Sequence, residues 1–376
     1  MLGLRRQEKS PSGARASRLW PSRSVYWGAK RLPVRGPRYA VPRLERNRLS
    51  MTIGYVKRVT FLCPAVITGG PEAIHQAAQL LAEQGLPTDI AYYGGDGRLH
   101  FDGGELLITP PSENPCLAAY AKYEPAVCRK ILLRRHHLVV LPETLATQAR
   151  PFQRASVAIW WLSVDNALPG VHAATWRTLF ADRDLKHFAQ SAYAADFLRR
   201  NGVRSSYPLG DYTDPAFTSI VPEAPNPEPG LAYNPAKGAD LADAFFAASP
   251  DLRGVPLRGM AKPEIVAALR NTMVYVDFGH LPGKDRLPRE AAASGAVVFV
   301  RKLGAGRFGE DFPIPDFFRF DEDDVASGEL RRRVAQVQAD PTAFWMQQEE
   351  FRATIRGERA TLRDQLLALR GRERAA

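Results

Sequence analysis

A polar, charged segment between two apolar runs is the part of this sequence best suited to chemistry. It contains Gly279, His280, Gly283, Lys284 and Arg286, followed by Glu290. Backbone amides and cationic side chains bind phosphate groups, and a carboxylate accepts hydrogen bonds from hydroxyl groups. These residue types therefore suit a nucleoside diphosphate with ribose hydroxyls beside it.

The flanking residues predict the elements that hold this segment. The β-rich apolar run 273–276 indicates a strand, residues 288–294 a short helix closed by Gly295, and residues 296–300 a second strand. Strand, loop, helix and strand make one βαβ unit of a parallel sheet. Its loop lies beyond the carboxyl end of a strand, where such sheets bind ligands.

The same alternation of strands and helices extends over most of the chain. Strands are expected at 58–63, 89–93, 138–141, 156–162 and 186–190, and again at 231–233 and 252–257. Four prolines within residues 222–229 indicate a semi-rigid linker. We therefore expect an α/β protein with two Rossmann-like domains and a ligand in the cleft between them. The predicted domains are 51–221 and 231–340, and the linker is 222–230. A long helix is expected in 341–376, where it packs back against the first domain. Gly357 could kink this helix.

The net charge of +11 is concentrated in the first 50 residues. This head holds 13 of the 51 Lys and Arg but only two of the 40 acids, so the remainder is neutral. We expect the head, residues 1–50, to be disordered. It resembles a transit peptide, or a tail for nucleic acid or membrane surfaces, or sequence upstream of a true start at Met51. We favour the last, because a clear strand begins just after Met51. The neutral remainder gives no reason to expect nucleic-acid binding.

Other classes of protein receive little support. No apolar run approaches the ~20 residues of a membrane helix. Three cysteines, Cys63, Cys116 and Cys128, suggest a reducing compartment. Their spacing from His136 and His137 matches no compact zinc pattern. We expect a cytoplasmic protein, either free or peripheral at the inner membrane face, with no cofactor and no bound metal.

Three segments together resemble GT-B glycosyltransferases, specifically the bacterial group associated with surface polysaccharide synthesis. The segments are 68–76 (TGGPEAIHQ), 233–238 (YNPAKG) and 277–295, which ends in EAAASG. The resemblance covers most of 51–370. It implies transfer of a sugar from a nucleotide-sugar donor, held mainly by the second domain, to a glycan or lipid-linked acceptor. Many retaining members carry a further Glu eight residues before the one matched by Glu290, where this chain has Pro282. The sugar-contacting carboxylate is therefore either absent or replaced by a neighbour such as Asp277 or Asp285.

Further candidate residues follow from position. Lys237 could contact the donor phosphate, and Lys284 and Arg286 could neutralise the leaving diphosphate without a metal. Gly69 and Gly70 would let the backbone approach a phosphate or an acceptor. Asp165, at the end of a strand, is the candidate base for an acceptor hydroxyl, and His75 could also face the cleft. For each there is a structural alternative: a surface lysine, a tight turn, an Asx turn, or a buried histidine.

Two other functions stay open. Pro282 is compatible with a catalytically silent GT-B-like protein that binds a glycan or nucleotide. A nucleotide-sugar epimerase of GT-B shape is the third alternative, and turnover without an acceptor would distinguish it.

Overall fold

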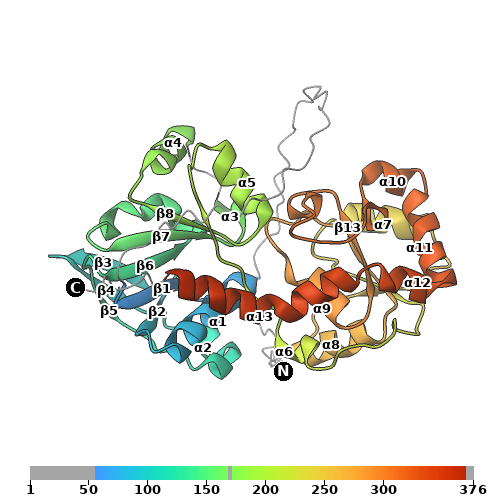
Figure 1. Cartoon of the computed structure of the whole chain (residues 1–376), viewed down its shortest axis with the longest axis horizontal. Helices are drawn as coiled ribbons and strands as arrows, with labels where there is room; N and C mark the ends of the chain where they lie inside the picture. Colours follow the sequence, from blue (N-terminus) through green and yellow to red (C-terminus); the bar gives the residue numbers. More distant parts are fainter. Residues whose placement is uncertain (1–55, 168–171, 370–376) are drawn as a thin grey trace, which may run out of the picture. The chain divides into compact units, whose positions relative to one another are not determined.

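The computed structural model describes residues 56–167 and 172–369. The predictions for the basic head, residues 1–50, and for Met51 therefore lie outside the described residues. Figure 1 shows two parallel sheets with helices packed around them, which confirms the predicted α/β class.

The first sheet has six parallel strands in the order β2-β1-β6-β7-β8-β9. Its strands are β1 (Arg58–Pro64), β2 (Thr88–Tyr93), β6 (His137–Pro142), β7 (Ser156–Trp161), β8 (Lys186–Ala189) and β9 (Tyr207–Pro208). A separate antiparallel sheet contains β3 (Arg98–Asp102), β4 (Glu105–Thr109) and β5 (Lys130–Leu132). The helices of this half are α1 (Gly69–Glu83), α2 (Cys116–Ala119), α3 (Val164–Ala167), α4 (Ala173–Ala181) and α5 (Ala192–Arg200), with 3-10 turns η1 (Ala121–Tyr123), η2 (Glu143–Gln148) and η3 (Arg150–Phe152).

The second sheet has five parallel strands in the order β11-β10-β12-β13-β14. Its strands are β10 (Leu231–Tyr233), β11 (Gly254–Pro256), β12 (Val274–Asp277), β13 (Val297–Arg301) and β14 (Arg319–Phe320). Short α6 (Pro215–Thr218) precedes it. The remaining elements are α7 (Ala239–Ala247), α8 (Lys262–Arg270), α9 (Arg286–Ala293), η4 (Ala305–Arg307), η5 (Asp316–Phe318), α10 (Glu322–Ala326), α11 (Glu329–Ala339), α12 (Pro341–Met346) and α13 (Glu349–Leu369).

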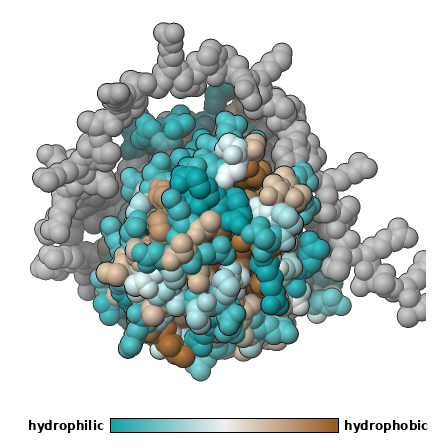
Figure 2. Space-filling model, turned by 90° about the vertical axis from the view of Figure 1, so that its right-hand side faces the viewer, coloured by the Kyte–Doolittle hydropathy of each residue, from teal (hydrophilic) through white to brown (hydrophobic). Residues whose placement is uncertain are grey.

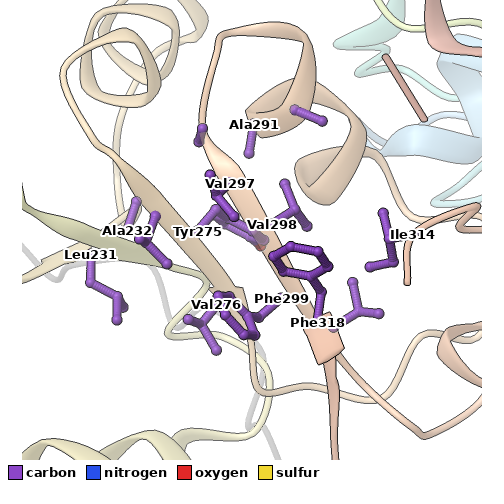
Figure 3. Close-up of a cluster of buried hydrophobic side chains, with 14 of the residues drawn as sticks. Leu231, Ala232, Tyr275, Val276, Ala291, Val297, Val298, Phe299, Ile314 and Phe318 are labelled. Atoms are coloured by element: carbon purple, nitrogen blue, oxygen red, sulfur yellow. The ribbon is translucent and has the colours of Figure 1, made fainter. Parts of the chain in front are cut away.

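Buried parallel strands explain the near-continuous apolar runs in the sequence. Figure 3 shows Tyr275, Val298 and Phe299 of β12 and β13 packed together with Phe318 in the core of the second half. In the first sheet, Trp160 and Trp161 point to opposite faces and are both fully buried. Neither tryptophan is therefore available to stack on a ligand.

Helix α13 joins the cores of the two halves. Phe351 and Ile355, near its start, belong to the core of the second half, whereas Leu362 and Leu366 pack in the first-half core. Figure 1 shows α13, in red, running from beside α9 to beside α1. Helix α13 thus contacts elements of both halves.

The predicted single helix over 341–370 is wrong in one respect. The helix breaks between Met346 and Glu349, and Gly357 lies inside α13. At the break the fully buried Gln348 side chain bonds both backbone groups of Val298, the N–H at 3.0 Å and the carbonyl oxygen at 2.8 Å. These two hydrogen bonds hold the break between α12 and α13 against β13.

The outer face formed by the last helices of the second half is mostly hydrophilic. Figure 2 shows scattered hydrophobic residues there, with no large apolar patch. Within residues 56–167 and 172–369, no helix combines the length and the apolar character needed to cross a membrane.

Candidate active site

A cavity of about 660 Å³ lies beyond the carboxyl ends of the first sheet. The first-half lining includes Pro64, Tyr93 and Pro142, the last residues of β1, β2 and β6. The strand order runs outward in both directions from β1 and β6, so these ends form the switch point where open parallel sheets bind ligands. The position of the cavity thus matches the place where chemistry is expected.

The opposite wall comes from the loops that follow β10 and β12. It contains Lys237 together with the segment Pro282, Gly283, Lys284, Asp285 and Arg286. In the second sheet β10 and β12 also flank the switch point, since β11 lies on one side and β13 on the other. The cavity is therefore formed between two switch points.

Two glycines let these loops approach each other closely. Gly238 has φ 67°, and a Cβ there would lie 2.2 Å from the Phe278 carbonyl oxygen. Gly279 would bring a Cβ within 2.4 Å of the Cβ of Lys237. The fully buried Asp277 fixes the same loop, because it accepts hydrogen bonds from the Gly279 N–H at 3.0 Å and the Tyr275 hydroxyl at 2.9 Å.

The segment 282–286 is fastened directly to the first half. The Val164 N–H donates to the Pro282 carbonyl at 3.0 Å, and the Lys284 N–H donates to Gln190 Oε1 at 2.9 Å. At Gly283 a Cβ would lie 2.2 Å from the Leu162 carbonyl oxygen. Pro282, the departure from the family pattern, thus makes a backbone contact between the halves.

The three predicted cations all line the cavity, and each pairs with a carboxylate. Lys237 Nζ lies 2.8 Å from Asp285 Oδ1, and Lys284 Nζ lies 2.9 Å from Glu358 Oε1 of α13. Arg286 lies 2.8 Å from Glu72 Oε2 in α1 and 3.2 Å from Asp211 Oδ2. A ligand phosphate would have to share or replace these partners.

Arg289, which the sequence interpretation missed, is the centre of the ion-pair network behind the cavity. Its side chain is fully buried and donates to Asp211 at 2.9 and 3.0 Å and to Glu358 at 3.0 Å. Burial acts to raise the pKa of Asp211, but the positive charges of Arg289 and Arg286 hold it below its usual value. Burial likewise acts to raise the pKa of Glu358, but the positive charges of Arg289 and Lys284 hold it below its usual value. Asp211 therefore stays ionised and links β9 to α9.

Glu290, the predicted ribose ligand, is buried in α9 and is not part of the cavity lining. Burial raises its pKa to about 7, partly offset by Arg286 and Arg289. At the start of α1, Gly69 and Gly70 do line the cavity, and the Gly69 carbonyl accepts a hydrogen bond from Arg286 at 3.2 Å.

The expectation that His75 could face the cleft is wrong. Its side chain has no exposed surface, Nδ1 lies 2.7 Å from the Pro71 carbonyl oxygen, and Nε2 lies 2.8 Å from the Tyr92 hydroxyl. Burial lowers its pKa, so the ring is neutral. His75 therefore packs and bonds within the first-half core.

Asp165 and His280, predicted separately, meet each other. Asp165 Oδ2 lies 2.5 Å from His280 Nε2, and the Tyr193 hydroxyl donates to both carboxylate oxygens at 3.1 and 3.2 Å. None of the three lines the cavity. Their interaction joins the two halves, and other residues form the cavity wall.

A carboxylate that the sequence interpretation missed does line the cavity. Glu143 follows Pro142 at the end of β6 and is only 5% exposed. Its Oε2 accepts a hydrogen bond from the Leu162 N–H at 3.2 Å. Asn166 and Gln190, two amides of the same wall, were missed as well. The available signal was a polar residue just beyond an apolar strand.

Among the described residues, no three His, Cys, Asp or Glu side chains are grouped so that they could hold a metal ion. This finding applies to ranges 56–167 and 172–369 only.

No protein-family model and no curated protein sequence matches this chain. Solved structures do match. A point mutant of S. aureus TarM, in complex with fondaparinux, α-GlcNAc-glycerol and UDP, aligns with a TM-score of 0.55 and 8% identity over 84% of this chain and 99% of that chain. Anabaena HepE in complex with UDP-glucose gives a TM-score of 0.55, 11% identity, and coverage of 82% and 98%.

A trehalose-phosphate synthase from Burkholderia vietnamiensis, described as UDP-forming, aligns with a TM-score of 0.51 and 13% identity over 83% of this chain and 99% of that one. These neighbours are GT-B glycosyltransferases. The chain has the GT-B fold. The predicted architecture of two Rossmann-like domains with a long C-terminal helix is thereby confirmed. At these low identities the likeness is one of fold, and residue roles must be argued from the cavity.

Proposed function

We propose that this protein is a glycosyltransferase that moves a sugar from a nucleotide-sugar donor to a glycan or lipid-linked acceptor. The observation that supports it best is the cavity between the two switch points, with cations on one wall and Glu143 with neutral polar groups on the other. A transferase needs this division, because the donor is anionic and the acceptor is a neutral hydroxyl. The GT-B fold adds support, since one neighbour is bound to UDP-glucose and another is described as UDP-forming.

In this proposal the second half binds the donor. Lys237, Lys284 and Arg286 would face the diphosphate and stabilise the charge that grows as the glycosidic bond breaks. Their positive charge would serve where other enzymes use a metal ion, so we propose metal-independent transfer. Glu290, one turn into α9, would accept hydrogen bonds from the ribose, which requires its buried side chain to become part of the cavity wall.

Uridine nucleotides are the first donors to test. The TarM complex contains UDP, and the HepE complex contains UDP-glucose. The α-GlcNAc-glycerol in the TarM complex supports a glycan as the acceptor class. We place this chain in surface polysaccharide synthesis at the cytoplasmic face of a membrane, where a lipid-linked acceptor would be found.

Thermal-shift titration of the full chain with UDP, GDP, ADP and CMP tests the donor assignment. One diphosphate should raise the melting temperature selectively, because a ligand at a hundredfold excess over its Kd adds about 2.7 kcal/mol to the free energy of unfolding. Lys237→Ala should lose most of this shift. Lys302→Ala is the matched control, because Lys302 is equally exposed (33% against 34%) and pairs with Asp316 away from the cavity. Equal shifts in both variants would contradict the diphosphate assignment.

A specific observation also favours a second candidate, a silent protein that binds nucleotide or glycan without turnover. Pro282 stands where the resemblance to retaining GT-B enzymes implies a carboxylate, and Lys284 and Arg286 are already paired with Glu358 and Glu72. Nucleotide binding with no release of diphosphate from any nucleotide sugar would support this alternative over the first.

A further inference from the structure

Glu143 occupies an unusual position for a carboxylate. It lies at the carboxyl end of β6, on the first-half wall of the cavity, and its side chain is almost fully buried. The Leu162 N–H donates to its Oε2 at 3.2 Å, and the nearby Ser163 N–H and Asn166 side chain act to lower its pKa. The carboxylate is thus held in one orientation while it remains part of the cavity wall.

No cation pairs with Glu143 within the described ranges of the chain. Three other buried acids near the cavity, Glu72, Asp211 and Glu358, each have an Arg or Lys partner. In the described part of the chain, buried Asp277 and Glu290 also lack such a partner, but they do not line the cavity. Burying a carboxylate without a counter-charge is costly, and burial raises the pKa of Glu143 to about 7. Such groups in cavities are enriched among residues that transfer protons.

We propose that Glu143 is the general base that removes the proton from the acceptor hydroxyl. This inference rests on the proposed transferase function. The acceptor oxygen forms a bond to the anomeric carbon while the bond from that carbon to the phosphate oxygen breaks. The electron pair of the broken bond leaves with the nucleoside diphosphate, whose charge is balanced by Lys237, Lys284 and Arg286. The hydroxyl proton passes to the Glu143 carboxylate and then to water.

This assignment has a stereochemical consequence. Glu143 comes from the first half, and the cations that would hold the leaving group come from the second. A base on the side opposite the leaving group assists direct displacement, which inverts the anomeric configuration. Asp165, the base expected from sequence, is bonded to His280 and Tyr193 and does not line the cavity.

The charged and titratable groups that face Glu143 are few. Tyr93 comes from β2, and its hydroxyl bonds to Thr144. From α3 the nearest groups are neutral, since Asp165 is turned toward His280. Across the cavity are Lys237, Lys284, Asp285 and Arg286. Because Glu143 must be ionised to act, kcat/KM should rise with pH through about 7 and then level off.

Glu143→Gln in the full chain tests the proposal, because the amide oxygen can still accept from Leu162 but cannot take a proton. With UDP-glucose or UDP-N-acetylglucosamine as donor and octyl glucoside as acceptor, kcat should fall roughly 10²–10⁴-fold. The affinity for UDP should stay within twofold, and the rise near pH 7 should disappear. NMR of the wild-type product should show an inverted anomeric centre. Exposed Glu113→Gln is the matched control and should change nothing.

The outcomes separate the two claims. A Glu143→Gln variant as active as an active wild type, or a product with retained configuration, would overturn the base assignment and leave the transferase function in place. No turnover by the wild type with these donors would overturn the proposed function for uridine nucleotides, and the base role with it. A loss of UDP binding in Glu143→Gln would show that the residue acts through the fold rather than as a base.

Discussion

At the scale of single residues, Gly283 decides how closely the cationic loop approaches the first half. A Cβ there would meet the Leu162 carbonyl oxygen at 2.2 Å and Gln190 Oε1 at 2.9 Å. A backbone carbonyl cannot rotate away as a side chain can. We therefore expect Gly283→Ala to push the loop off, weaken the Pro282–Val164 contact, and lower the free energy of unfolding by roughly 1–3 kcal/mol.

Gly357→Ala is the matched control for this prediction. Gly357 lies inside α13, and an added Cβ has no neighbour within 4 Å. This variant should be more stable by about 0.5–1 kcal/mol, because alanine favours the helix. Urea denaturation of both variants measures the difference. A Gly283→Ala protein as stable and as active as the wild type would contradict the close contact.

Glu143 also gives a prediction about stability and pH. Its folded-state pKa of about 7 lies above its ordinary value of 4.5. Between those values the folded state keeps a proton that the unfolded chain has released, so this residue's contribution to stability falls as pH rises. Glu143→Gln should therefore gain stability relative to the wild type on going from pH 5 to pH 8. Melting temperatures at the two pH values measure it, and an unchanged difference would refute the raised pKa.

Sequence reasoning found part of this site for a clear reason. Lys237, Gly283, Lys284 and Arg286 follow apolar strands directly, and a polar residue beyond a buried strand is a local signal. Glu143 carries the same signal after the apolar run 138–141, but its burial in the cavity wall depends on residues distant in the sequence, such as Leu162. The prediction for His75 failed for a different reason. Whether a residue in α1 faces the core or the cleft depends on how the helix packs, which no local signal shows.

At the scale of elements, α1, α9, α13 and the segment after β9 are joined by buried ion pairs. Arg289 is fully buried between Asp211 and Glu358. Removing one partner leaves a buried charge uncompensated, so Asp211→Asn should cost about 3–5 kcal/mol. Glu83→Gln, which breaks the exposed Glu83–Arg359 pair, should cost less than about 1 kcal/mol. Equal denaturation midpoints for the two variants would contradict the account.

The elements themselves were largely predictable. The elements β12, α9 and β13 lie within two residues of their predicted positions, because strong periodicity marks their interiors. The break before α13 was not predictable, since it depends on the distant backbone of Val298. None of the strands expected from the sequence belongs to the three-stranded sheet of β3, β4 and β5. The partners of Arg289 were hidden for the same reason: they are 69 and 78 residues away.

At the scale of the whole described molecule, the cavity needs both α/β halves. The first contributes Glu143 and the start of α1, and the second contributes Lys237 and the segment 282–286. Contacts among the loop, Asp211 and α13 hold the two walls together. The second half supplies the cations and the first half supplies Glu143. We therefore infer that transfer requires both halves to be in contact.

The release of nucleoside diphosphate tests the central claim most directly. The full chain would be incubated with each common nucleotide sugar and octyl glucoside, and the mixture followed by NMR. The account predicts that one donor releases its diphosphate as a new glycoside appears in equal amount. A nucleotide sugar returned unchanged, or converted to its epimer without acceptor, would contradict glycosyl transfer.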